Sequence, residues 1–164
     1  MRDIIRVGIA EYKICKVPEE ISTLGLGSCV GVVIYNKETG ICGLAHIMLP
    51  DSKKMASSDN PYKFADTCLQ EMIEQLQKQA GKNATFFAKV AGGAKMFNHS
   101  SNQEFLNIGA LNYVAVCCVL AGYHIPIVSE DVGGNFSRTI IYNSENQELL
   151  IKAVKEKGVE KYVI

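Results

Sequence analysis

Short apolar runs separated by glycine-rich or polar turns dominate the first third of the chain. This pattern predicts β-strands rather than helices. We expect strands at about Val7–Ile14, Ile21–Leu24, Val30–Tyr35 and Cys42–Met48. The third of these is apolar on both faces, which is typical of a central strand covered on two sides. The turn between the last two strands is Asn36–Gly40.

The middle of the chain carries two helix patterns. Asp59 or Asn60 can cap the first helix, Pro61 suits its first turn, and Gly81 can end it. Its apolar residues recur every three or four positions, as expected for one buried stripe: Phe64, Ala65, Cys68, Leu69, Met72, Ile73 and Leu76. The second helix, in "NIGALNYVAVCCVLAGY", is nearly all apolar and closes at Gly122.

The remaining segments complete a layered fold. "TFFAKVAGG", "HIPIVSEDVGG" and "SRTIIYN" have strand composition with glycine breaks, and the tail "QELLIKAVKEKG" has helical propensity. Strands interleaved with two long helices predict an α/β or α+β domain. We expect one domain over residues 1–164, with the role of the tail (residues 144–164) left open.

Composition narrows the classes of function. Seventeen basic and seventeen acidic residues cancel to a net charge of zero, which argues against a nucleic-acid partner or a polybasic membrane contact. The chain has no run of about 18 apolar residues and no signal-peptide pattern, so we expect no membrane insertion.

The six cysteines lie inside apolar runs, where free cysteine behaves as a small hydrophobic residue. No CxxC pair supports a zinc site, and Cys42 with His46 lacks the further ligands that a metal needs. We therefore expect a reduced, cytoplasmic protein without metal or cofactor, with five structural thiols and one candidate for chemistry, Cys29.

Cys29 and His46 belong to neighbouring strands of a predicted hairpin. If the loop is Asn36–Thr39, Tyr35 pairs with Gly40 and the cysteine stands directly opposite the histidine. A one-residue slip would place them on opposite faces, whereas a two-residue shift would keep them on one face as diagonal neighbours. The pattern permits a thiol–imidazole contact without requiring it.

Such a contact would have a defined chemistry. An imidazolium at His46 would lower the pKa of Cys29 below its usual ~8.5 and create a nucleophile. Gly25, Gly27 and Gly31 would leave room for a substrate, and backbone N–H groups such as those of Ser28 or Cys29 could stabilise an oxyanion. The alternative is ordinary packing, with a buried cysteine and a hydrogen-bonded core histidine.

A third group must orient the imidazole of His46. Thr23 could accept its second N–H, and Ser22, Asp51 and Asp131 are rivals that spacing alone does not exclude.

Two more glycine breaks, "VAGGAKMF" and "SEDVGGNFSR", match no phosphate-binding motif. They are tight turns or the edge of a substrate groove. Lys95 and Arg138 beside them are the cations best placed to hold an acidic partner.

As a set, these segments resemble one family. "TLGLGSCVGVVIYN", "GLAHIMLP", "KVAGGAKMF", "NIGALN" and "DVGGNFSR" occur in the order and spacing of the chemoreceptor glutamine deamidases (CheD) of bacterial chemotaxis. The resemblance runs from about Val7 to Tyr142. It implies that Cys29, His46 and Thr23 form a catalytic triad.

The resemblance also implies a three-layer α/β sandwich related to bacterial toxin deamidase cores. It implies methyl-accepting chemotaxis receptors as substrates and the phosphatase CheC as a partner that imitates them. The chain departs from the family at Ser137, where a glycine often precedes the arginine, and we place no family motif in the tail from Ser144. Two alternatives remain: a glutamyl methylesterase with the same triad, and a non-catalytic adaptor for CheC or receptors.

Overall fold

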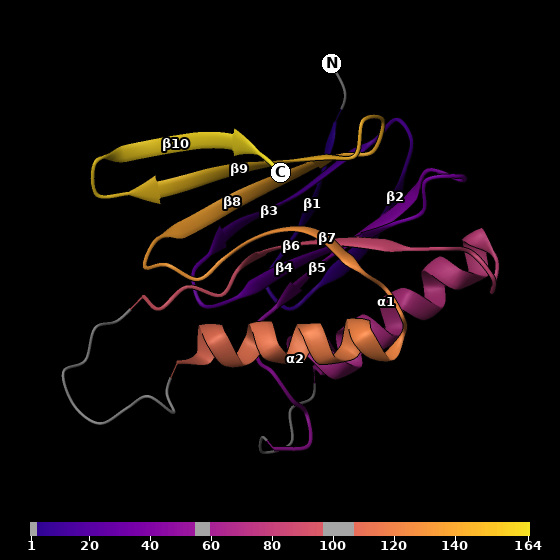
Figure 1. The fold of residues 1–164 in the computed structure, drawn as a ribbon, viewed down its shortest axis with the longest axis horizontal. Coiled ribbons are helices and arrows are strands. Elements are labelled where there is room, and N and C mark those ends of the chain that lie inside the picture. Colours follow the sequence, from indigo (N-terminus) through magenta and orange to yellow (C-terminus); the bar gives the residue numbers. More distant parts are fainter. Residues whose placement is uncertain (1–2, 55–59, 97–106) are drawn as a thin grey trace.

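The fold was analysed in a computed structural model, which describes residues 3–54, 60–96 and 107–164 (Figure 1). The described residues form ten strands, two α-helices and one short 3₁₀ helix. The strands are β1 (Ile4–Val7), β2 (Tyr12–Lys16), β3 (Glu20–Leu26), β4 (Val30–Tyr35), β5 (Ile41–Ile47), β6 (Phe87–Gly92), β7 (Ile127–Val132), β8 (Ser137–Asn143), β9 (Glu148–Lys155) and β10 (Gly158–Val163). The helices are η1 (Pro61–Lys63), α1 (Ala65–Ala80) and α2 (Ile108–Gly122).

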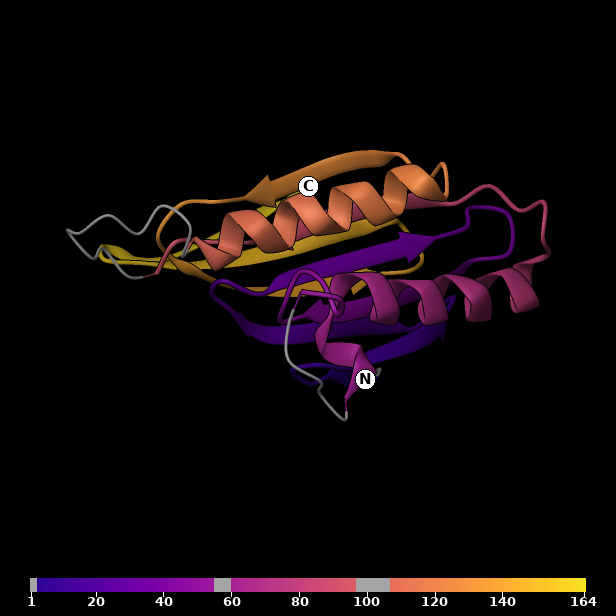
Figure 2. The same cartoon turned by 90° about the horizontal axis from the view of Figure 1, so that it is seen from below.

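The strands form two five-stranded sheets. The first, called sheet A, has the order β1-β3-β8-β9-β10, and the second, sheet B, has the order β2-β5-β4-β6-β7. Both sheets are mixed, because β1 runs parallel to β3 and β6 runs parallel to β7. Both helices lie on one face of sheet B, and sheet A lies on the other (Figures 1 and 2). The predicted α+β sandwich of three layers is confirmed.

Two apolar cores hold these layers together. Val32 and Ile34 of β4 pack in the core beneath the helices, whereas Val33 and Tyr35 of the same strand pack in the core between the sheets. β4 is therefore buried on both faces, as its uninterrupted apolar sequence predicts. Within the described residues, no helix is long and apolar enough to cross a membrane.

The start of the chain differs from the prediction. The single strand expected over Val7–Ile14 is two strands, β1 and β2, that belong to different sheets. A tight turn separates them, in which the Gly8 N–H donates to the Glu11 carboxylate at 2.7 Å and Ala10 has a φ of 57°. The turn lets the chain leave sheet A and enter sheet B.

The helix expected in the tail is also wrong. Residues 148–163 form the hairpin of β9 and β10, which completes one edge of sheet A (Figure 1). Leu149 and Ile151 are buried in the core between the sheets, Ala153 is buried at the next alternate position, and the residues between them are more exposed. This alternation has the period of a strand, and it outweighs the helical propensity of the lysines and glutamates.

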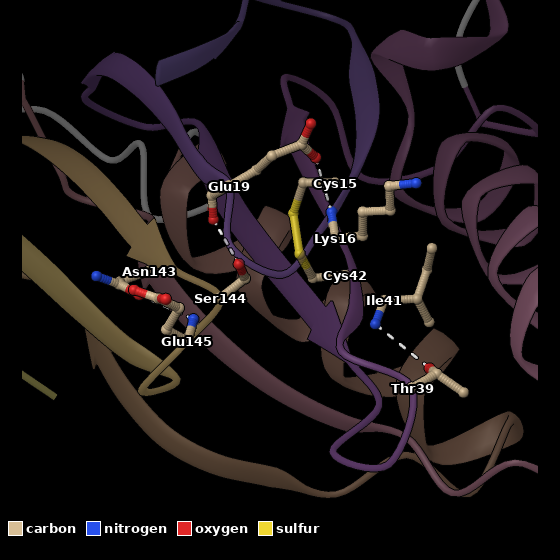
Figure 3. The surroundings of a disulfide bond; sticks show 9 residues. All are labelled: Cys15, Lys16, Glu19, Thr39, Ile41, Cys42, Asn143, Ser144 and Glu145. Atoms are coloured by element: carbon tan, nitrogen blue, oxygen red, sulfur yellow. Dashed lines mark hydrogen bonds between the residues drawn. A yellow bond between two sulfur atoms is a disulfide. The ribbon is translucent and has the colours of Figure 1, made fainter. Parts of the chain in front are cut away.

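The expectation of six reduced cysteines is wrong for one pair, because Cys15 and Cys42 form a disulfide (Figure 3). The two residues stand directly opposite each other on β2 and β5, with their Cα atoms 5.1 Å apart. This separation lies within the usual range for a disulfide. The free cysteines of the described residues are Cys29, Cys68, Cys117 and Cys118.

The helix boundaries follow the sequence closely. Gly81 ends α1 with a φ of 104°. The Asn60 side chain caps η1 by accepting the Tyr62 N–H at 2.9 Å, so it acts one turn before α1 itself. Asp59, the alternative cap, lies outside the described residues.

Candidate active site

His46 lies in the interior between the two sheets. Its side chain is fully buried, and its backbone is fixed on β5 by pairing with Gly31 of β4. Its Nδ1 lies 2.7 Å from the Thr23 hydroxyl of β3, which is also buried. Sheet A thus contributes the hydroxyl and sheet B the imidazole.

This contact sets the tautomer of the imidazole. The Thr23 hydroxyl donates its single hydrogen to the Val7 carbonyl at 2.7 Å. It can therefore only accept from His46, so Nδ1 must carry a proton. Neutral His46 then has a free lone pair on Nε2, and this buried atom has no hydrogen-bond partner among the described residues. A lone pair of this kind can take a proton from a nearby acid.

Cys29, the residue directly before β4, packs against the same interior. Of the registers that the sequence left open, the pairing of Tyr35 with Gly40 does not occur: Tyr35 pairs with Cys42, so the loop is two residues longer. Extending the observed register by one residue beyond Val30 sets the cysteine diagonal to His46 on the same face of sheet B. Cys29 is half-buried and packs against the core between the sheets. The diagonal arrangement is the one that a two-residue shift predicts.

The loop that carries Cys29 is held against the end of β6. The Gly93 N–H donates to the Cys29 carbonyl, and the Ala94 N–H donates to the Gly27 carbonyl, both at 2.9 Å. Gly92 makes this approach possible, because a Cβ atom there would lie 2.3 Å from the Cys29 carbonyl oxygen. The two glycines of "VAGGAKMF" therefore allow the close approach of the loop that carries Cys29 and donate a hydrogen bond to it.

Burial disfavours the charged forms of both candidate groups. It raises the pKa of the Cys29 thiol and lowers the pKa of His46 to about 4. Both shifts oppose the expected thiolate–imidazolium pair near neutral pH. The arrangement provides instead a protonated thiol and a neutral imidazole that can act as its base.

The rivals of Thr23 have other partners. Ser22 accepts a hydrogen bond from Arg6 at 3.4 Å, and the Asp51 carboxylate accepts the Lys53 N–H at 2.8 Å. Asp131 accepts hydrogen bonds from Arg138 and Tyr162. Among the described residues, Thr23 is the one hydrogen-bonded to the imidazole ring.

The two predicted cations differ in exposure. Arg138 is 2% exposed, and its guanidinium binds Asp131 at 2.9 Å and the Gly133 carbonyl at 2.9 Å, so it cannot hold an acidic partner as expected. Its role is to tie sheet A to sheet B. Lys95 is exposed and lines a hollow of about 290 Å³ beside the start of α2, together with Tyr113.

Sequence reasoning missed Asn112. This fully buried residue of α2 donates to the Ser28 carbonyl at 2.9 Å and to the Met48 carbonyl at 3.1 Å. The available signal was one amide in an otherwise almost wholly apolar helix. No group of three metal-ligating side chains occurs within residues 3–54, 60–96 and 107–164.

Fold and site together define an α+β protein with a candidate cysteine–histidine centre between two sheets. The family model described as CheD chemotactic sensory transduction matches residues 48–153. The match includes most of β9, so the family resemblance extends beyond Tyr142 into the tail. The match to the family model begins after Thr23, Cys29 and His46. These three residues lie within the longer alignments to individual relatives, which cover more than nine-tenths of the chain.

Several relatives match most of the chain. "Probable chemoreceptor glutamine deamidase CheD" of Lachnoclostridium phytofermentans is 45% identical over 154 residues, which are 94% of this chain and 96% of the relative. "Chemoreceptor glutamine deamidase CheD" of Bacillus licheniformis is 44% identical over 93% of this chain and 92% of its own. The protein of the same name from Halalkalibacterium halodurans is 43% identical over 95% of this chain and 97% of its own length. The chain belongs to the CheD family.

Proposed function

We propose that this chain is a chemoreceptor glutamine deamidase that converts glutamine side chains of methyl-accepting chemotaxis receptors to glutamate and releases ammonia. The names of its relatives support the reaction and the substrate. The observation that carries a cysteine mechanism is the buried Thr23–His46 hydrogen bond, which leaves Nε2 free on the face that also holds Cys29.

The reaction proceeds in two halves. The Cys29 sulfur attacks the carboxamide carbon while His46 Nε2 takes the thiol proton. His46 then gives this proton to the departing nitrogen, which leaves as ammonia, and a thioester remains. In the second half His46 removes a proton from water, the hydroxide attacks the thioester, and the proton returns to the cysteine sulfur as glutamate departs.

Neighbouring groups assist both halves. Thr23 keeps the imidazole in the tautomer that can accept a proton, a role that a carboxylate or amide has in other triads. We assign the oxyanion to backbone N–H groups near Gly27 and Ser28, where the chain turns into β4. Thr23 is uncharged and stabilises an imidazolium less than a carboxylate would, which fits an imidazole that stays neutral at rest.

The surroundings of the site suit a protein substrate. Met48 is 38% exposed just after β5, and Met96 is 40% exposed beside Gly27. Flexible methionine side chains adapt to apolar protein surfaces. Each turnover would add one negative charge to a receptor helix and change the repulsion between packed helices. We also infer that CheC binds the chain by imitating this substrate.

The cytoplasmic location remains part of the proposal. Its original support was a set of reduced cysteines, and the Cys15–Cys42 disulfide weakens that support, since disulfides are uncommon in reducing compartments. The remaining support for a cytoplasmic location is the proposed substrate, a chemotaxis receptor.

The test is turnover of purified receptor fragments, followed by the mass change of each glutamine and by ammonia release. The Cys29→Ala and His46→Ala variants should release no ammonia while they keep the wild-type circular dichroism spectrum. Cys118→Ala, which removes an exposed free thiol, is the matched control and should remain active. Normal turnover by Cys29→Ala would refute the mechanism, and inactive wild-type protein that still binds receptors or CheC would favour the adaptor.

Thr23 offers a finer test. Thr23→Val keeps the shape of the side chain but removes the acceptor of the Nδ1 proton, so kcat should fall roughly tenfold to a hundredfold with little change in KM. Thr23→Ser keeps the hydroxyl and should retain most of the activity. If Thr23→Val matched the wild type, another group would have to orient His46. Methyl-ester substrates in the same assay would expose a methylesterase.

A further inference from the structure

Asn112 is the polar side chain of α2 that reaches the candidate site. Its amide nitrogen donates to two carbonyl oxygens, those of Ser28 at 2.9 Å and Met48 at 3.1 Å. The first belongs to the residue before Cys29, and the second lies two residues after His46. One amide group thus joins the two segments that carry the candidate nucleophile and base.

The contact lies where the backbone pairing of β4 with β5 stops. The last paired residues at this end are Val30 and Ile47. One step further, Cys29 and Met48 would be the next pair, but the observed pairing does not include them. The Asn112 amide therefore supplies hydrogen bonds to both segments just beyond the point where their backbone pairing ends.

Helix α2 is placed to make this contact by a close backbone approach. A Cβ atom on Gly109, one turn before Asn112, would lie 2.4 Å from the Ala94 carbonyl oxygen. A Cβ atom on Gly93 would lie 2.9 Å from the Gly109 carbonyl oxygen. Because Gly93 also donates to the Cys29 carbonyl, the helix and the cysteine loop are held on the same glycine turn.

The carboxamide oxygen of Asn112 indicates that the hydrogen bonds donated by its nitrogen are the contacts that hold the side chain in place. Asn112 Oδ1 is buried and has no hydrogen-bond partner within the described residues. An unpaired buried acceptor is unfavourable, and an apolar residue of similar size would avoid it. Turning the amide around would set Oδ1 against two carbonyl oxygens, so the observed orientation is the one that chemistry allows.

We propose that Asn112 is a positioning residue that holds the Cys29 loop and the end of β5 in the alignment needed for proton transfer between Cys29 and His46. The proposal rests on the proposed deamidase function. Asn112 does not touch the reacting atoms; it acts through the Ser28 and Met48 carbonyls.

The experiment compares Asn112→Leu with Asn36→Leu. Asn36 is a matched control, because it is also buried and also bridges backbone groups, donating to the Thr85 carbonyl at 2.8 Å at the opposite end of the β4–β5 hairpin. With receptor fragments, Asn112→Leu should lower kcat roughly tenfold or more and change KM by less than about twofold, because small misplacements of reacting groups are costly. Asn36→Leu should keep the wild-type kcat in its folded fraction.

Hydrogen exchange followed by mass spectrometry provides a readout that needs no turnover. Backbone amides around residues 26–31 and 46–50 should exchange faster in Asn112→Leu than in the wild type, and Asn36→Leu should leave them unchanged. Unchanged exchange in Asn112→Leu would overturn the proposal, and so would faster exchange with an unchanged kcat. Wild-type protein that fails to deamidate receptors would instead overturn the proposed function, with the exchange result still deciding whether Asn112 holds the two segments.

Discussion

At the scale of single residues, burial decides the charge state of the candidate site. His46 is enclosed between the sheets and meets a hydroxyl rather than a carboxylate, so nothing nearby offsets the cost of charging it. In the proposed mechanism, the neutral imidazole accepts the thiol proton as the sulfur attacks the substrate carbon. This arrangement keeps Cys29 a thiol, and hence a weak nucleophile, until a substrate arrives.

The depressed pKa of His46 predicts a pH-dependent stability. The folded value is about 4 and the ordinary value is 6.5, so between these limits the unfolded chain binds a proton that the folded chain does not. The contribution of this group is complete above pH 6.5 and is lost as the pH falls towards 4. The loss amounts to on the order of 3 kcal/mol. Urea unfolding at several pH values measures it.

The control for this measurement is His46→Asn, which removes the titrating group. Carboxylates also titrate near pH 4, but they do so in both proteins. The difference in unfolding free energy between wild type and His46→Asn should therefore shrink from pH 7 to pH 4.5. A difference that does not depend on pH would contradict the depressed pKa.

Single residues also show how far sequence reasoning reaches. Side chains alternate with a period of two, so the sequence limited Cys29 and His46 to the same face or to opposite faces, and the length of the loop, which the sequence did not fix, decided between the two. The burial of Arg138 and the position of Asn112 depend on contacts between residues far apart in the chain. Such contacts leave no local pattern, although a lone amide in an apolar helix is a hint.

At the scale of elements, periodicity was a good guide where packing and propensity agree. Helix α1 has a buried stripe and good helix formers, and it was predicted correctly. The tail has helix-forming residues but buries every second side chain, and it forms β9 and β10. The hairpin of β4 and β5 was predicted with a loop two residues too short, because a loop of polar residues does not specify where pairing begins.

The turn after β6 provides a prediction at this scale. Gly92 has a φ of 112°, and a Cβ atom there would collide with the Cys29 carbonyl oxygen at 2.3 Å. Gly133 has a φ of 82° but open space around it. Both alanine substitutions introduce backbone strain, so their difference isolates the collision. Gly92→Ala should lose deamidation by displacing the cysteine loop, whereas Gly133→Ala should lose some stability and keep its kcat. Equal kcat values for the two folded variants would show that the loop tolerates the displacement.

At the scale of the whole molecule, the candidate site depends on how the sheets pack. Thr23 comes from sheet A, His46 comes from sheet B, and Cys29 directly precedes β4 of sheet B. Arg138 of β8 binds Asp131 of β7, so a buried ion pair also spans the two layers. A change that lets the sheets slide past each other would therefore lengthen the Thr23–His46 hydrogen bond. The interior between the sheets thus serves stability and, in the proposed mechanism, also holds the catalytic groups.

The Cys15–Cys42 disulfide lies in this same interior and leads to a prediction about the whole chain. It joins residues 27 positions apart, and closing such a loop in the unfolded chain is worth about 3–4 kcal/mol. Thiol labelling of denatured protein without reductant should modify four cysteines, and labelling after reduction should modify all six. Cys15→Ser should lower the unfolding free energy, whereas Cys118→Ser, at an exposed free thiol, should not.

Reducing the Cys15–Cys42 disulfide should affect catalytic activity less than it affects stability. The pairing of β2 with β5 extends over five residue pairs and, with the bond between the His46 N–H and the Glu11 carbonyl, holds the histidine strand without help from the sulfurs. Reduced protein should therefore keep its kcat well below its unfolding temperature. Six labelled cysteines before reduction would contradict the disulfide, and a reduced protein that is stable but inactive would mean that the disulfide itself sets the position of His46.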